Sequence, residues 1–189
     1  IGQQTNQSLY YLGQIAEKQN KPDQAITWYE QVTQGSHYFP ALSRSAELRA
    51  EAGDLESAIE QLRDIKEANP QAAANLWLIE INLLQSLGEL EQARATADTA
   101  LQDHPKDQSL LYARSMVFEQ LGAIDESLTD LRTIIELKAD NPTALNALGY
   151  VMTIHTEPLE EAQGDIEQAL AMAPRNPATL DSMGWVLFR

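Results

Sequence analysis

The 189-residue chain contains no cysteine, which excludes a disulfide framework, a thiolate metal site and a cysteine nucleophile. Basic residues are also scarce, with 13 lysines and arginines against 28 aspartates and glutamates and a formal net charge of −15. This charge repels nucleic-acid phosphates and anionic lipid headgroups, so we expect no nucleic-acid partner. No window approaches the roughly 18 apolar residues of a membrane span. We therefore expect no direct membrane span.

Catalytic motifs are missing as well. The three histidines, His37, His104 and His155, lie far apart in the sequence, and none has a second ligand at a spacing such as H-E-x-x-H. The chain has no phosphate-binding G-x-x-x-x-G-K-[ST] loop and no G-x-S-x-G nucleophile elbow. We therefore expect no enzymatic activity, no metal and no cofactor.

What the chain does contain is a repeat with a period near 34 residues. Gly53, Gly88 and Gly122 are separated by 35 and 34 residues. Small residues recur at intervals of 33, 35, 34 and 35 residues, namely Ala25, Ala58, Ala93, Ser127 and Ala162. Glycine accepts the positive φ that reverses the chain after a helix, and a small residue lets the next helix approach closely. Each repeat is therefore predicted to be two antiparallel helices.

Apolar residues inside the repeats follow helical steps of three and four, as in Trp77, Ile81 and Leu84. Prolines at Pro40, Pro142 and Pro177 suit the first turn of a helix. We predict one array over residues 1–189, with repeats at about 6–38, 39–73, 74–107, 108–141 and 142–176 and the first helix of a sixth at 177–189. Trp28 and Trp77 fall on the core side, where we expect them to pack.

The repeat resembles the tetratricopeptide repeat, whose pattern is W-x2-L-G-x2-Y, then A-x3-F, then P. The first match is carried by Leu9, Leu12, Gly13, Ala16, Ala25 and Tyr29, and the fifth by Leu145, Leu148, Gly149, Met152, Ala162, Ile166 and Pro174. This resemblance implies an all-α fold, a right-handed α-solenoid of antiparallel helix pairs with about five and a half repeats. The incomplete sixth repeat leads us to expect a piece of a longer protein, with its last helix covered by a neighbouring copy or frayed.

A narrower resemblance is carried by NPTALNALGY, NPATLDSMGW and the longer turn at Pro158 between them. These features are similar to the tetratricopeptide lipoproteins of proteobacteria. That resemblance implies an adaptor in the periplasm, anchored to the outer membrane through an upstream segment, that brings cell-wall hydrolases to a protease of the C-terminal-processing type. A cytoplasmic location stays open at this stage.

The resemblance also implies a concave groove lined by the first helices of the repeats. Its expected inner positions are four residues apart on each helix: Tyr10 and Gln14, Ser43 and Glu47, Leu78 and Asn82, Tyr112 and Met116, Asn146 and Tyr150, Asp181 and Trp185. None of these is lysine or arginine, so the clamp that similar domains use for acidic peptides is absent. We therefore predict a partner-binding surface for an apolar peptide or helix, formed by Leu78, Asn82, Tyr112, Met116, Asn146, Tyr150, Asp181 and Trp185. Asn82 and Asn146 are expected to offer a donor and an acceptor to a bound backbone.

Two alternatives stay open for these residues. The inner aromatics could simply pack on adjacent helices, and the acidic second helices could either solvate the outer face or steer a basic partner. Three function classes follow: a protein-binding adaptor, a substrate-recruiting arm of a larger enzyme, or a scaffold that assembles with copies of itself through the uncapped last helix.

Overall fold

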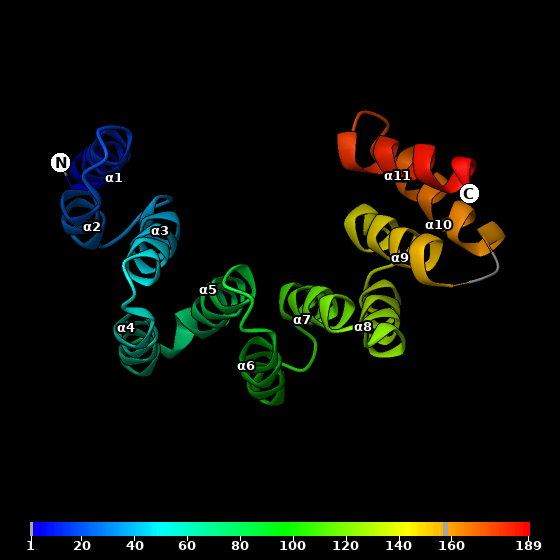
Figure 1. The fold of residues 1–189 in the computed structure, drawn as a ribbon, viewed down its shortest axis with the longest axis horizontal. Coiled ribbons are helices and arrows are strands. Elements are labelled where there is room, and N and C mark those ends of the chain that lie inside the picture. The colour runs from blue at the N-terminus through cyan, green and yellow to red at the C-terminus, as the bar shows by residue number, and fades with distance from the viewer. Residues whose placement is uncertain (1, 157–158) are drawn as a thin grey trace. The chain divides into compact units, whose positions relative to one another are not determined.

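A computed structural model describes residues 2–156 and 159–189. Within that part the chain forms eleven α-helices, one short 3-10 helix and no strand (Figure 1). The helices are α1 (Gly2–Lys18), α2 (Pro22–Glu30), α3 (Tyr38–Glu51), α4 (Leu55–Ala68), α5 (Ala73–Ser86), α6 (Leu90–Asp103), α7 (Gln108–Leu121), α8 (Ile124–Leu137), α9 (Pro142–His155), α10 (Leu159–Met172) and α11 (Pro177–Phe188), and the 3-10 helix η1 is Pro70–Ala72. The all-α prediction is confirmed.

The helices group into two compact units, residues 1–83 and 84–189, and the division falls inside α5. Each unit is built from consecutive helices that pack on their neighbours, such as α1 on α2 and α3 on α4 in the first, and α7 on α8 and α9 on α10 in the second. The boundaries of the repeats, and one continuous array over the whole chain, stay predictions.

The turn glycines behave as the sequence predicts. Gly53, Gly88 and Gly122 have φ of 89°, 78° and 75°. At Gly122 the backbone N–H donates to Glu119 O at 3.1 Å, and the N–H of the next residue donates to Phe118 O at 2.9 Å. This pair of bonds satisfies carbonyls that the end of a helix leaves free, in the arrangement known as the Schellman motif. The motif ends α7 sharply and returns the chain antiparallel as α8.

The recurring small residues lie where two helices meet. Ala25, Ala58, Ala93, Ser127 and Ala162 are all 0% exposed. The contact is close between α9 and α10, where a Cβ built on Gly149 would lie 2.6 Å from Ile166 Cγ1 and 2.7 Å from Ala162 O. Glycine at this position therefore permits the backbone approach. The extra turn residue predicted near Pro158 lies outside the described residues.

Ion pairs join successive helices at related positions. In the first unit Glu80 of α5 is fully buried and pairs with Arg63 at 3.2 Å and Lys66 at 3.4 Å. In the second unit Arg114 of α7 pairs with Asp98 of α6 at 2.9 Å and with Asp130 of α8 at 2.7 Å. These pairs satisfy charges that burial would otherwise penalise.

Both predicted packing tryptophans are partly buried. Trp28 packs against a cluster that includes Ala16, Ala25 and Tyr29. Trp77 carries the Lys66 ammonium over its ring, with Nζ 2.8 Å from the ring centroid. Burial lowers the pKa of Lys66, and the charge of Glu80 acts in the opposite direction. The Trp77 ring is therefore covered by the aliphatic stem and the ammonium of Lys66.

Candidate functional site: a pocket between α9 and α11

Helices α9 and α11 begin in the same way, and this sets their side chains in the same register. Asn141 caps α9, with its Oδ1 accepting from Ala144 N at 3.1 Å, and Pro142 opens the helix. Asn176 caps α11, with its Oδ1 accepting from Ala178 N at 2.9 Å, and Pro177 follows. An asparagine cap satisfies free helix donors, and proline fits the position after it. The two helices pack against each other within the second unit, and both also contact α10 (Figure 1).

A pocket of about 430 Å³ opens between these two helices. It is lined by Tyr150, Ile154, Leu180, Asp181, Gly184 and Trp185. Tyr150 is 38% exposed and Trp185 43% exposed, so both rings are accessible to a partner. Its size falls in the range of sites that accept a small molecule or a few side chains. We call it the α9/α11 pocket.

Three of the predicted site residues, Tyr150, Asp181 and Trp185, therefore line one pocket. The Trp185 ring stacks on Phe188, with ring centroids 5.7 Å apart and an interplanar angle of 29°. A Cβ built on Gly184 would meet no atom within 4 Å, so this glycine adds to the open volume. The pocket thus combines two aromatic faces, two aliphatic side chains and one carboxylate.

The other predicted residues of the second unit are less accessible. Tyr112 and Met116 of α7 are both half-buried, and burial raises the pKa of the Tyr112 hydroxyl. Asn146 Oδ1 is buried and has no hydrogen-bond partner among the described residues. That atom is not available to the backbone of a bound segment, although the prediction gave Asn146 an acceptor role. The binding roles of these three residues stay predictions.

In the first unit the predicted inner pairs of the first two repeats are bonded within themselves. Gln14 Nε2 donates to Tyr10 OH at 3.3 Å, and Ser43 Oγ donates to Glu47 Oε1 at 3.1 Å. These contacts place each pair on one helix face, as the spacing of four predicts. Leu78 and Asn82 of α5 also belong to the first unit, where Leu78 is half-buried and Asn82 exposed.

Sequence reasoning missed Ile154, Leu180 and Gly184, which complete the pocket. A signal was present, because Ile154 lies four residues after Tyr150, and Leu180 and Gly184 are themselves four apart. One further helical step on α9 and a second stripe on α11 would have found them.

A second hollow of about 180 Å³ lies in the first unit. It is lined by Tyr29, Glu30, Val32, Thr33, Tyr38, Leu42, Ser45, Gln61 and Ile65, and none of these is a predicted site residue. Its charged member, Glu30, pairs with Arg49. This hollow is part of the packing between α2, α3 and α4 and holds less than half the volume of the α9/α11 pocket.

Each of the three histidines lies at the end of a different helix. His37 precedes α3 and stacks on Tyr10, with ring centroids 4.6 Å apart. His104 follows α6, and His155 ends α9 with its Nε2 3.3 Å from Glu119 Oε1. Among the described residues no group of three or more histidine, cysteine, aspartate or glutamate side chains could hold a metal ion. No described helix is long and apolar enough to cross a membrane.

Family models, a related sequence and solved structures all relate this chain to tetratricopeptide-repeat proteins. Residues 7–34 and 80–144 match models of the tetratricopeptide repeat. A TPR repeat-containing protein of Pseudomonas aeruginosa is 36% identical over 180 residues, which cover 95% of this chain and 30% of that protein. The chain thus spans about a third of the length of this relative.

Solved structures show the same fold at low sequence identity. A thermophilic TPR protein of Thermus thermophilus matches with a TM-score of 0.68 and 21% identity, covering 97% of this chain and 100% of that one. A tetratricopeptide repeat protein of Parabacteroides merdae gives 0.66 and 16%, covering 98% and 73%. YrrB, a TPR protein with an unusual peptide-binding site, gives 0.60 and 15%, covering 93% and 90%.

Proposed function

Since this chain is a tetratricopeptide-repeat protein, we propose that it binds a segment of a partner protein in the α9/α11 pocket. Proteins of this family generally mediate protein–protein interaction. The observation that carries the proposal is the pocket itself, where Tyr150 and Trp185 are exposed beside Asp181 in a hollow of about 430 Å³. Exposed aromatic side chains that gather in a concave site are typical anchors for a partner.

The finer proposal is that the chain acts as an adaptor in the periplasm, which holds cell-wall hydrolases for a protease of the C-terminal-processing type. Its support is the resemblance of NPTALNALGY and NPATLDSMGW to the proteobacterial lipoproteins. Anchoring to the outer membrane through an upstream segment belongs to the same proposal. Fractionation of cells that make the full-length protein tests the location, and recovery in the cytosol alone would contradict it.

The partner-binding proposal is tested by affinity capture with immobilised chains. The native chain and a Tyr150→Ala/Trp185→Ala variant are incubated in parallel with envelope and cytosolic extracts, and bound proteins are identified by mass spectrometry. We expect partners that bind the native chain and are lost from the variant. Recovery of an envelope protease or cell-wall hydrolase among them would support the finer proposal.

A matched control is Tyr11→Ala/Leu137→Ala. Tyr11 is 47% exposed and Leu137 38% exposed, so this variant removes a similar amount of exposed apolar surface outside the pocket. It is expected to keep the partners. Identical recoveries from the native chain and from the pocket variant would contradict binding in the α9/α11 pocket.

A further inference from the structure

Asp181 of α11 differs from the other carboxylates on the odd-numbered helices, which are the first helices of the antiparallel pairs. Each of the others has a basic partner: Glu17, Glu47 and Glu51 contact Arg44, Glu80 contacts Arg63 and Lys66, and Glu119 contacts His155. Asp181 makes no ion pair within the described part of the chain, and it lines the α9/α11 pocket. Its charge is therefore available to a partner.

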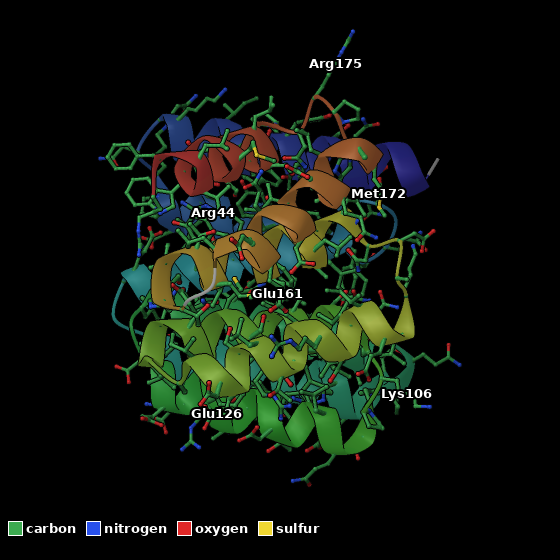
Figure 2. The ribbon with its side chains drawn as sticks, turned by 90° about the vertical axis from the view of Figure 1, so that its right-hand side faces the viewer. Arg44, Lys106, Glu126, Glu161, Met172 and Arg175 are labelled. Carbon is green, nitrogen blue, oxygen red and sulfur yellow. The ribbon has the colours of Figure 1, made fainter. Side chains whose placement is uncertain are left out.

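The basic side chains closest in sequence do not neutralise Asp181. Arg189 at the end of α11 donates from its guanidinium to the carbonyl of Thr153 on α9 at 2.9 Å. Arg175 projects into solvent from the loop between α10 and α11 (Figure 2). None of the six residues that line the pocket is basic. The pocket is thus negatively charged at one side and aromatic or aliphatic on the rest of its wall.

From this geometry, and resting on the proposed function, we infer that the partner residue that enters the α9/α11 pocket is a lysine or an arginine. A long basic side chain has an aliphatic stem and a charged head, and each part has a counterpart in the wall of the pocket. The stem covers Ile154 and Leu180, and the charged head pairs with Asp181 and lies against the ring faces of Tyr150 and Trp185.

Other residue types fit less well. An acidic side chain would meet the charge of Asp181 and the net charge of −15. A purely apolar side chain would fill the hollow but would remove water from an unpaired carboxylate, which opposes binding. The basic side chain is the one that buries apolar surface and compensates the carboxylate at the same time.

The test uses random peptides displayed on phage. Peptides are selected on the native chain, and those that also bind the Tyr150→Ala/Trp185→Ala variant are discarded. In each remaining peptide the basic residues are replaced one at a time by norleucine, which keeps an aliphatic chain and removes the charge. Affinities are then measured for the native chain, for Asp181→Asn and for Glu126→Gln, a control that removes one exposed charge on α8 (Figure 2).

We expect one basic residue whose replacement weakens binding to the native chain about tenfold, because an ion pair and cation–π contacts are lost together. The same replacement should have a smaller effect on binding to Asp181→Asn, where only the cation–π contacts remain to be lost, and should keep its full effect on Glu126→Gln. Added salt should weaken the native complex. Circular dichroism checks that Asp181→Asn is folded.

The outcomes separate the inference from the function on which it rests. Two results would overturn the inference and leave the proposed function standing. The first is a set of pocket-dependent peptides that insert an apolar or acidic residue in place of a basic one. The second is a norleucine effect that is unchanged in Asp181→Asn. Selection that yields no pocket-dependent peptide would contradict both.

Discussion

Gly149 and Gly184 hold the same helical position in α9 and α11, 35 residues apart, but their surroundings differ. Gly149 faces the backbone of α10, where a Cβ would lie 2.7 Å from Ala162 O. Gly184 faces open space and lines the α9/α11 pocket. One residue type thus permits helix packing at the first position and leaves room at the second.

This difference gives a matched pair of substitutions. Gly149→Ala is expected to lower the free energy of unfolding by about 1 to 3 kcal/mol, because α10 must shift to admit the methyl group. Gly184→Ala is expected to raise it by about 0.5 to 1 kcal/mol, because alanine is the better helix former and meets no neighbour. Denaturant unfolding followed by circular dichroism measures both. Equal effects of the two changes would contradict the packing described for α9 and α10.

A second prediction separates core residues from pocket residues. Leu84 is 1% exposed and Tyr150 is 38% exposed. Leu84→Ala is expected to cost about 2 to 5 kcal/mol through lost burial and a residual cavity, whereas Tyr150→Ala should leave the melting temperature nearly unchanged. Thermal unfolding measures both variants. A large loss of stability in Tyr150→Ala would mean that this ring serves packing, which is the alternative left open by the sequence.

At the scale of helices, charge placement differs between repeats that otherwise match. Arg63 pairs with Glu80 in the first unit. Asp98 lies 35 residues after Arg63, and Arg114 lies 34 residues after Glu80. Asp98 and Arg114 also form an ion pair, but the acidic and the basic residue have exchanged positions. Arg114 also holds Asp130 of α8. Thirty-five residues after Asp130 lies Asp165 of α10, but the position that corresponds to Arg114 is Leu148. Asp165 Oδ2 is buried and has no hydrogen-bond partner among the described residues.

The buried, unpaired carboxyl of Asp165 is expected to make the stability of the fold depend on pH. Burial, and then the charge of Glu161, raise the pKa of the Asp165 carboxyl above its ordinary 3.8, while Arg132 acts to lower it. Because the folded state favours the protonated form, the ionised carboxylate lowers stability above its folded pKa, and this penalty disappears below pH 3.8. Asp165→Asn is therefore expected to raise the unfolding midpoint at neutral pH and to lose that advantage in acid.

Urea unfolding of Asp165→Asn and the native chain at several pH values measures this effect. Glu126→Gln on α8 serves as the control for net charge. A stabilisation by Asp165→Asn that grows as the pH falls would contradict the sign of the shift.

Most of the helix arrangement could be predicted from the sequence, because it depends on residues whose role is local. Gly122 ends a helix through its own φ, and Ala162 marks a close contact through its size. The ion pairs could not be predicted in the same way, because Glu80 and Arg114 occupy matching positions with opposite charges. Such pairs depend on which side chain of a neighbouring helix faces the charged residue, and the repeat period alone does not specify that side chain.

The candidate site was predictable in part for the same reason. The spacing of four placed Asn146 with Tyr150 and Asp181 with Trp185 on matching helix faces, and the structure brings Tyr150, Asp181 and Trp185 into one pocket. It also shows what the spacing could not, namely that Asn146 Oδ1 is buried and that Gly184 opens volume. Burial of one atom and room beside a missing Cβ depend on packing between helices.

At the scale of the whole molecule, two surfaces offer different kinds of contact to a partner protein. The second helices carry most of the acidic residues, as in α8 and α10, where Glu126 and Glu161 are exposed (Figure 2). The first helices α9 and α11 carry the pocket, with exposed aromatic rings around one unpaired carboxylate. A partner held by long-range charge alone would use the first surface, whereas one held by an inserted side chain would use the second.

Site-specific photocrosslinking distinguishes these surfaces most directly. A photoreactive benzoylphenylalanine replaces Leu180, which is 49% exposed inside the pocket, or Met172, which is 41% exposed at the end of α10 outside it. Both chains are irradiated in an envelope extract, and crosslinked proteins are identified by mass spectrometry. We expect protein adducts from position 180 and none of the same adducts from position 172. Adducts at position 172 with none at position 180 would contradict partner binding in the α9/α11 pocket.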